Sequence, residues 1–175
     1  EPIVNIFRIV DADAFAGEGL RTVIYVSGCN HACPFCYNRL LWDPKVGEPI
    51  TPAVLKRLDD DLANPNIDGV TFFGGEATFP PNRAEATKLM RYLKEKHPTK
   101  TNWTYTGYRF EDVKDLAMME YIDVLVDGLY VQRLNLGMGK SKWRGSANQR
   151  IVLVRESLKA GQTVFYRDLD GTELK

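Results

Sequence analysis

Short runs of apolar and β-branched residues alternate along this chain with longer segments in which apolar residues recur every three or four positions. That alternation is typical of strand–helix units, and it predicts a mainly parallel sheet with helices packed on it. The expected strands are residues 22–26, 70–73, 102–106 and 122–126, with further strands expected at 151–154 and 163–166. The pattern therefore places the chain in the α/β class.

Three helices are expected between these strands. The first begins after Thr51, a residue that suits an N-cap and is followed by proline, and it runs to about residue 62. The second is expected to be capped by Asn82, with Glu85 three residues further on as in a capping box. The third covers residues 110–119.

Chain length limits how these units are arranged. With 175 residues the chain is too short for a closed eight-unit barrel of roughly 250 residues, so we expect a partial, open βα barrel. We expect a single domain over residues 1–175, in which about 151–175 form a C-terminal extension that covers a sheet edge. Ligands of such sheets bind at the C-terminal ends of the strands.

Composition excludes several classes of partner. Lys and Arg together number 23, as do Asp and Glu, so the overall charge favours neither nucleic acid nor an anionic membrane. No apolar run reaches the length of a membrane span, and the first residues lack the features of a signal peptide. We therefore expect a cytoplasmic protein that binds neither nucleic acid nor membranes.

All three cysteines of the chain, Cys29, Cys33 and Cys36, follow the first core strand. Soft thiolates at this spacing favour an iron–sulfur cluster or zinc. Both kinds of site ordinarily take four protein ligands, so three cysteines on a four-iron cluster leave one iron open. Zinc with His31 as fourth ligand is the alternative, although His31 lies between two cysteines in a tight loop. A disulfide framework leaves one thiol unpaired.

The cysteine spacing, with Phe35 just before the last cysteine, resembles the signature of radical S-adenosylmethionine enzymes. This resemblance implies a barrel of the radical S-adenosylmethionine type, a 4Fe-4S cluster on the three cysteines, and S-adenosylmethionine on the open iron. In that superfamily the reduced cluster cleaves the cofactor to methionine and a 5′-deoxyadenosyl radical. The protein then supplies binding, orientation and exclusion of side reactions, with no catalytic residue expected beyond cluster and cofactor.

The resemblance also implies which residues bind the cofactor. The Gly-Gly-Glu segment would bind its amino group, the backbone around the last cysteine would line the nucleoside, and polar strand ends would meet ribose or carboxylate. These residues are Phe35, Cys36, Tyr37, Gly74, Gly75, Glu76, Thr104, Thr106 and Asp127. The alternative for the glycines is an ordinary strand-to-helix turn, and for the two aromatic side chains it is core packing. For Thr104, Thr106 and Asp127 the alternative is that they are ordinary polar residues at the solvent end of strands.

Four further segments narrow the resemblance. Residues 17–21, 103–108, 121–128 and 143–149 are similar, in order and spacing, to the activating component of anaerobic (class III) ribonucleotide reductase. The similarity extends to about residue 150. It implies hydrogen abstraction from a backbone glycine of the reductase large subunit, with the electron supplied by a flavodoxin-like donor. The chain departs from the family in one motif, because it has Gly-Gly-Glu-Ala where Gly-Gly-Asp-Pro is usual.

Other functions stay open on sequence alone. They are an activase of another glycyl-radical enzyme such as pyruvate formate-lyase, a small-molecule radical enzyme, an iron–sulfur electron carrier, and a zinc-stabilised module. A basic cluster around Trp143 is either a solvated face or a contact for the reductase. Its members are Lys140, Lys142, Arg144 and Arg150.

Overall fold

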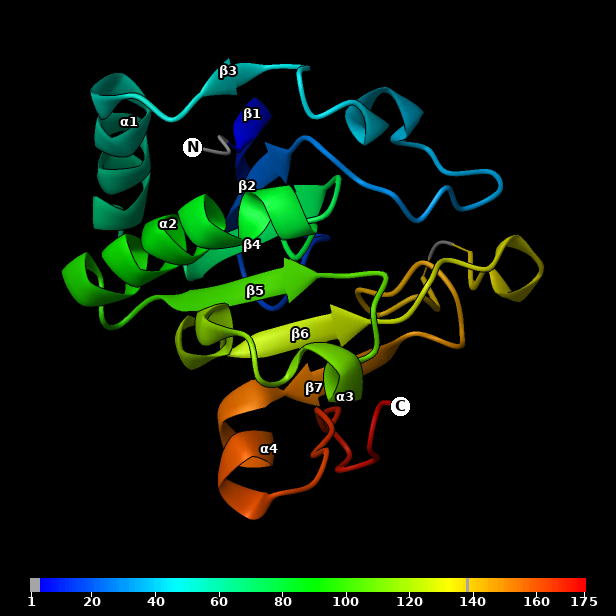
Figure 1. Ribbon diagram of the computed structural model, residues 1–175. Helices are drawn as coiled ribbons and strands as arrows, with labels where there is room; N and C mark the ends of the chain where they lie inside the picture. Colours follow the sequence, from blue (N-terminus) through cyan, green and yellow to red (C-terminus); the bar gives the residue numbers. More distant parts are fainter. Residues whose placement is uncertain (1–3, 138) are drawn as a thin grey trace.

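The structure, a computed structural model, describes residues 4–137 and 139–175 (Figure 1). The strands are β1 (Asn5–Asp13), β2 (Arg21–Val26), β3 (Glu48–Pro49), β4 (Gly69–Gly74), β5 (Thr101–Tyr105), β6 (Val124–Asp127) and β7 (Arg150–Leu153). The helices are α1 (Pro52–Ala63), α2 (Arg83–Lys96), α3 (Phe110–Val113) and α4 (Val154–Ala160). Short 3-10 turns lie at Arg39–Trp42, Pro80–Asn82, Ala117–Tyr121 and Gln132–Leu134.

The strands of the described chain form one mixed sheet in the order β3-β1-β2-β4-β5-β6-β7. Its four central strands, from β2 to β6 in this order, are parallel, as the strand–helix pattern predicts. Strands β1 and β7 pair antiparallel with their inner neighbours. Within the described residues β3 and β7 are not paired with each other, so the sheet is open. The structure thus confirms the α/β class and the open sheet.

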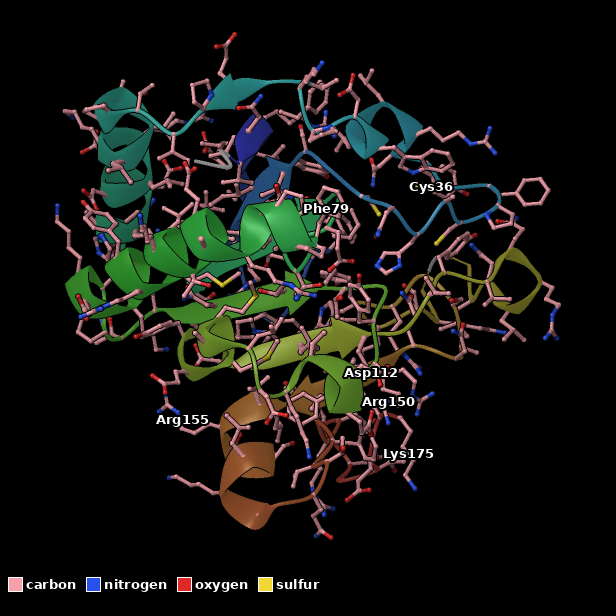
Figure 2. All side chains as sticks on the ribbon, in the orientation of Figure 1. Cys36, Phe79, Asp112, Arg150, Arg155 and Lys175 are labelled. Carbon is pink, nitrogen blue, oxygen red and sulfur yellow. The ribbon has the colours of Figure 1, made fainter. Side chains whose placement is uncertain are left out.

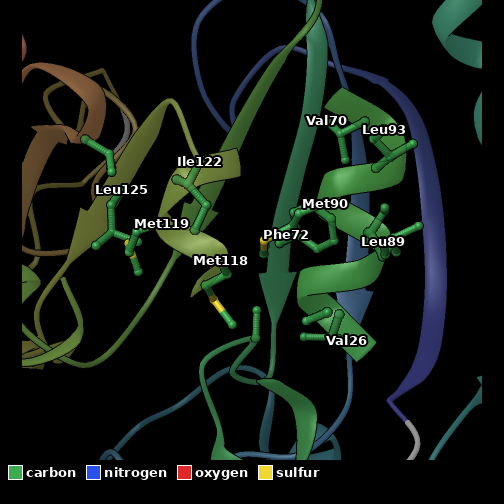
Figure 3. Close-up of a cluster of buried hydrophobic side chains, with 14 of the residues drawn as sticks. Val26, Val70, Phe72, Leu89, Met90, Leu93, Met118, Met119, Ile122 and Leu125 are labelled. Atoms are coloured by element: carbon green, nitrogen blue, oxygen red, sulfur yellow. The ribbon is translucent and has the colours of Figure 1, made fainter. Parts of the chain in front are cut away.

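Helices α1 and α2 cover one face of the sheet, where the larger core lies. Figure 3 shows Leu89, Met90 and Leu93 of α2 beside Val70 and Phe72 of β4, all 4% exposed or less. Their spacing puts the three helix residues on one face. Burial of a side chain of this size contributes about 1.5–3 kcal/mol, so this contact holds α2 firmly against the sheet. It also positions the turn between β4 and α2, which belongs to the site described below.

The opposite face of the sheet carries a smaller aromatic core. Trp103 of β5 is 1% exposed, and the Trp143 ring meets it edge-to-face with 5.1 Å between centroids. Tyr166 of the C-terminal extension packs against both tryptophan rings. This cluster attaches the loop that contains Trp143 to the sheet.

The C-terminal extension lies along β7, at the edge of the sheet. Leu153 N donates to Val164 O at 2.9 Å, and Tyr166 N donates to Ile151 O at 2.8 Å. The expected position at a sheet edge is therefore confirmed. The expected strand at 163–166 is reduced to an isolated bridge at Phe165, and helix α4, which precedes it, was not predicted.

The start of α1 agrees with the sequence, whereas the predicted cap of α2 is wrong. Thr51 Oγ1 accepts a hydrogen bond from Val54 N at 3.3 Å. Asn82 instead has helical backbone angles, and its Nδ2 donates to the main-chain oxygens of Ser27 and Glu76. Asn82 is buried, so its amide satisfies buried carbonyl groups nearby rather than the end of its own helix.

The continuous helix expected over residues 110–119 is also not formed. Helix α3 ends at Val113, and a 3-10 turn follows at Ala117–Tyr121. The adjacent residues Met118 and Met119 are both buried, at 0% and 2% exposed. Both side chains join the larger core from this 3-10 turn, so tertiary packing prevails here over the helical pattern of the sequence.

No helix in the described part of the chain combines the length and the apolar character that crossing a membrane requires.

Candidate functional site

A cleft of about 390 Å³ opens at the C-terminal ends of the central strands. Small-molecule sites typically have roughly 300–1,000 Å³. Two loops supply much of its wall: residues 27–38, which follow β2, and residues 128–149, which follow β6. Figure 1 shows these loops, in blue and in yellow to orange, on the side to which β5 and β6 point. The cleft therefore lies where parallel sheets commonly bind ligands.

The three cysteines line this cleft as free, partly buried thiols. Their loop is joined to the following turn by a hydrogen bond from Cys29 N to Trp42 O at 3.3 Å. Within the loop, Asn38 N donates to Cys36 Sγ at 3.4 Å. Figure 2 labels Cys36 on this loop, shortly before the 3-10 turn at Arg39–Trp42. The three cysteines thus line one cleft, and their role as cluster ligands stays a prediction.

Burial changes the acidity of these thiols. It raises the pKa of Cys29 to about 11, and it also raises the pKa of Cys33. Such thiols are protonated at neutral pH, so a bound metal must displace their protons to gain thiolate ligands. Soft sulfur donors of this kind fit an iron–sulfur cluster.

His31, the fourth ligand in the zinc alternative, faces a different group. Its Nε2 atom lies 2.9 Å from Glu76 Oε2, and its ring meets that of Tyr108 edge-on at 4.6 Å between centroids. Among the residues that the structure describes, no three His, Cys, Asp or Glu side chains converge on one position suited to a single metal ion. This finding includes the three cysteines, and His31 is paired with Glu76.

Gly74 and Gly75 bring the end of β4 against the cysteine loop. Gly74 has φ +96°, a conformation that favours glycine. A Cβ on Gly75 would lie 2.7 Å from Val26 O and 2.9 Å from Gly28 O, so a side chain does not fit here. Gly75 N donates to that same Val26 oxygen at 2.8 Å. Both glycines are needed for this close approach of two strand ends.

Glu76 follows these glycines and is 2% exposed. Its Oε2 atom lies 2.9 Å from His31 Nε2 and accepts from Gly107 N at 2.8 Å. Its Oε1 atom accepts from Thr78 Oγ1 at 2.5 Å and from Thr78 N at 3.3 Å. The carboxylate thus connects the end of β4, the cysteine loop and the end of β5.

Aromatic side chains line the deeper part of the cleft. Phe73 meets Tyr25 on one side and Tyr105 on the other, with 5.6 and 4.7 Å between ring centroids. Tyr105 Oη donates to Trp143 O at 2.5 Å, and burial raises the pKa of this hydroxyl. The row offers a rigid apolar surface inside the cleft.

The structure brings most of the predicted site residues together. Those that line the cleft are Cys29, Cys33, Cys36, Tyr37, Gly74, Gly75, Glu76 and Thr106. The side chains of Phe35 and Tyr37 are 67% and 83% exposed, so neither is the core residue that the alternative reading expects.

Thr104 and Asp127 lie outside the lining of the cleft and are left out of the proposed site. Thr104 is in register with Phe72 and Leu125, on the face that packs against the helices. Asp127 is fully buried, accepts from Phe110 N at 2.7 Å and is paired with Arg150. Asp127 is thus satisfied within the fold, whereas the buried Thr104 Oγ1 has no hydrogen-bond partner among the described residues.

The predicted basic cluster is divided between two environments. Arg150 is paired with Asp127 and Glu111 and does not join an exposed basic face. Arg144 lines the cleft, where it is the one Arg or Lys among the described lining residues. Its Nη1 donates to Lys175 O at 2.8 Å, whereas its buried Nε has no hydrogen-bond partner among the described residues. Burial lowers its pKa. Sequence patterns did not assign Arg144 to the cleft, because it is distant from the cysteines along the chain.

Comparison with known proteins relates this geometry to a family. Residues 15–152 match the family model described as a 4Fe-4S single cluster domain. The chain is 41% identical over 148 residues to the anaerobic ribonucleoside-triphosphate reductase-activating protein of Enterobacteria phage T4, which covers 85% of this chain and 93% of the relative. The protein of the same name from Escherichia coli K12 is 34% identical, over 83% of this chain and 96% of the relative. The one from Haemophilus influenzae is 35% identical, over 85% of this chain and 97% of the relative.

Proposed function

The chain belongs to the family of anaerobic ribonucleoside-triphosphate reductase-activating proteins, and we propose that it acts as a radical S-adenosylmethionine activase of such a reductase. The observation that carries this proposal is the set of three cysteines in one cleft, beside a Gly-Gly segment and an aromatic floor. When bound, a 4Fe-4S cluster and S-adenosylmethionine would supply one-electron cleavage of the cofactor and hydrogen abstraction from a reductase glycine. A flavodoxin-like protein in a reducing cytoplasm is the proposed electron donor.

The residues of this chain would hold and orient these groups. Cys29, Cys33 and Cys36 would bind the cluster. Backbone atoms of Gly74, Gly75 and the segment 35–37 would seat S-adenosylmethionine, since no side chain fits at Gly75 and both Cys36 and Tyr37 line the same cleft. The half-buried row of Tyr25, Phe73 and Tyr105, whose rings pack edge-to-face, would help to exclude water from the reacting region.

Arg144 would bind the carboxylate of S-adenosylmethionine. Its guanidinium is partly buried in the cleft, where Nη1 donates to the main-chain oxygens of Gln149 and Lys175. The buried Nε has no hydrogen-bond partner among the described residues, which leaves a donor for an anionic ligand. We expect Arg144→Gln to weaken S-adenosylmethionine binding about tenfold or more, since a hydrogen bond to a charged group contributes about 1.5–3 kcal/mol. Equilibrium dialysis with the cluster-loaded protein measures this.

The control for Arg144 is Arg155→Gln, because Arg155 is an exposed arginine of α4 far from the cleft in Figure 2. Arg155→Gln should bind the cofactor like the wild type. An unchanged affinity in Arg144→Gln would contradict the assignment.

The proposed activity is tested by cofactor cleavage. Protein reconstituted anaerobically with iron and sulfide is reduced and mixed with S-adenosylmethionine, and 5′-deoxyadenosine and methionine are then measured by chromatography. We expect both products in equal amounts and none without reductant. A fully loaded protein that binds S-adenosylmethionine and yields no deoxyadenosine would overturn the activase proposal and favour an electron carrier.

The mouth of the cleft has an apolar rim, which we define as Phe35, Tyr37, Leu40 and Leu129. These side chains are between 44% and 83% exposed. Tyr37 lines the cleft, Phe35 and Leu129 lie in the two loops that wall it, and Leu40 lies in the 3-10 turn that follows the first loop. The Tyr37 and Tyr130 rings, one from each loop, have 6.3 Å between their centroids. Grouped exposed apolar side chains commonly mark interaction surfaces. We propose that the rim contacts the reductase, whose glycine must reach the cleft.

Polar substitution of this rim should separate docking from cofactor chemistry. Leu40→Ser combined with Leu129→Ser is expected to weaken reductase binding at least about tenfold, because two apolar side chains of roughly 1.5–3 kcal/mol lose their burial at the interface. Deoxyadenosine formation without reductase should be unchanged. Leu158→Ser is the matched control, since Leu158 is 43% exposed on α4. Unaltered reductase binding by the double variant in a titration would refute the docking role.

A further inference from the structure

His31 occupies a slot between the strand ends that flank the cleft. Its ring packs against Tyr108, and a Cβ added to Gly107 would lie 2.6 Å from the ring. Gly107 therefore has no room for a side chain as long as His31 is seated. Through its position between Cys29 and Cys33, His31 joins the cysteine loop to the end of β5.

Glu76 holds His31 in this slot and has no free acceptor site left. A carboxylate has about four lone-pair sites. Each oxygen of Glu76 has two contacts: Oε1 with the Thr78 amide and hydroxyl, and Oε2 with the Gly107 amide and His31 Nε2. The group is also 2% exposed. A ligand amino group would have to displace one of these partners to reach it.

The contacts of Glu76 bridge segments that are far apart in the sequence. Position 76 is 45 residues from His31 and 31 residues from Gly107. The main chain reinforces the bridge, because Glu76 N donates to Gly28 O at 2.8 Å at the start of the cysteine loop. Side chain and backbone of one residue thus tie the cysteine loop to two strand ends.

We propose that Glu76 and His31 form a clasp that positions the cysteine loop for its cluster, and that Glu76 is a positioning residue rather than a direct ligand of the S-adenosylmethionine amino group. The part concerning S-adenosylmethionine rests on the proposed function, whereas the part concerning the cluster needs only an iron–sulfur protein. With Glu76 occupied, the amino group is left to the backbone oxygens of the neighbouring glycine segment.

The test measures how quickly iron is lost to a chelator from the reconstituted full-length chain, without S-adenosylmethionine. His31→Ala and Glu76→Gln should each speed the loss about tenfold, within the roughly 10–100-fold range of outer-shell substitutions. The double variant should lose iron no faster than the quicker single variant, because both changes open the same clasp. Circular dichroism checks that each variant is folded.

Two further variants control the test. His31→Gln keeps an amide donor near the position of Nε2 and should return the rate of iron loss towards that of the wild type. His97→Ala removes the other histidine, which lies 2.7 Å from Asp59 at the end of α2, and it should leave the rate unchanged.

Binding of S-adenosylmethionine to the same samples distinguishes the clasp from direct ligation. The clasp predicts that His31→Ala and Glu76→Gln change affinity in parallel, in step with iron loss. It is overturned if His31→Ala retains iron like the wild type, or if Glu76→Gln alone weakens binding while its iron loss is normal. Failure of the proposed function would give a different result, because the wild-type protein would then retain its cluster but bind no S-adenosylmethionine. The comparison of iron loss between variants would still test the clasp.

Discussion

Replacing Cys33 with alanine is expected to leave the chain without a stable iron–sulfur cluster. A four-iron cluster on three cysteines has no spare protein ligand, and the chain has no other cysteine to take the place of Cys33. Iron after anaerobic reconstitution should therefore fall from about four atoms per chain to almost none. Iron and sulfide analysis together with the visible absorption spectrum measures the loss. Cleavage of S-adenosylmethionine should disappear with it.

Asn30→Ala is the matched control for this prediction. Asn30 is an exposed residue of the same loop and is not among the residues that line the cleft. It should assemble a normal cluster. A Cys33→Ala protein with wild-type iron, sulfide and absorption would show that the three cysteines are not the cluster ligands.

Replacing Arg150 with methionine is expected to lower the free energy of unfolding by about 3–5 kcal/mol, because it leaves a buried carboxylate without its partner. Asp127 is 0% exposed, and Arg150 lies 2.5 Å from its Oδ2 and 3.0 Å from its Oδ1. Denaturant unfolding measures the change.

Adding Asp127→Asn removes the unpaired charge and should restore part of the loss. Arg155→Met, at an exposed pair, should change stability by less than about 1 kcal/mol.

Arg150→Met should also alter the pH dependence of stability. The hydrogen bond from Arg150 lowers the pKa of Glu111 to about 2 in the folded protein. A lowered folded-state pKa stabilises the protein above the ordinary pKa of glutamate, and this contribution is lost as pH falls towards 2. Arg150→Met should therefore show a shallower loss of stability between about pH 5 and pH 2. An unfolding free energy within about 1 kcal/mol of the wild type at neutral pH would contradict the structural role.

The strands that are buried on both faces were predictable from the sequence, as was β7 at one edge, whereas β1 and β3 at the other edge were not. Strands β2, β4 and β5 are runs of apolar and β-branched residues because helices cover one face and aromatic side chains the other. Strand β1 mixes exposed residues such as Arg8 and Asp11 with a few buried ones. Its structure depends on pairing with β2, which a local pattern does not reveal.

The proposed cluster ligands can be named from the sequence because they are local, whereas the partners of Glu76 cannot. The three cysteines lie within eight consecutive residues, so their spacing alone indicates a metal site. Glu76 meets His31 and Gly107 only after the strands have assembled. The hydrogen bonds of Asn82 and the place of Arg144 in the cleft likewise depend on segments distant in sequence.

Thr104 shows where a sequence signal was available. Side chains alternate between the two faces of a strand, so Thr104 must point away from its neighbours Trp103 and Tyr105. Those two aromatic residues lie on the face that continues into the cleft. Applying the alternation to residues 102–106 would have placed Thr104 on the helix-covered face.

The most direct test of the proposed activity is electron paramagnetic resonance of an anaerobic ribonucleotide reductase after incubation with the reduced, cluster-loaded protein and S-adenosylmethionine. The account predicts a glycyl-radical doublet on the reductase that depends on both the cofactor and this protein. The doublet should be absent when the protein carries Cys33→Ala. A reductase that binds this protein and gains no radical, while S-adenosylmethionine is cleaved, would contradict the account.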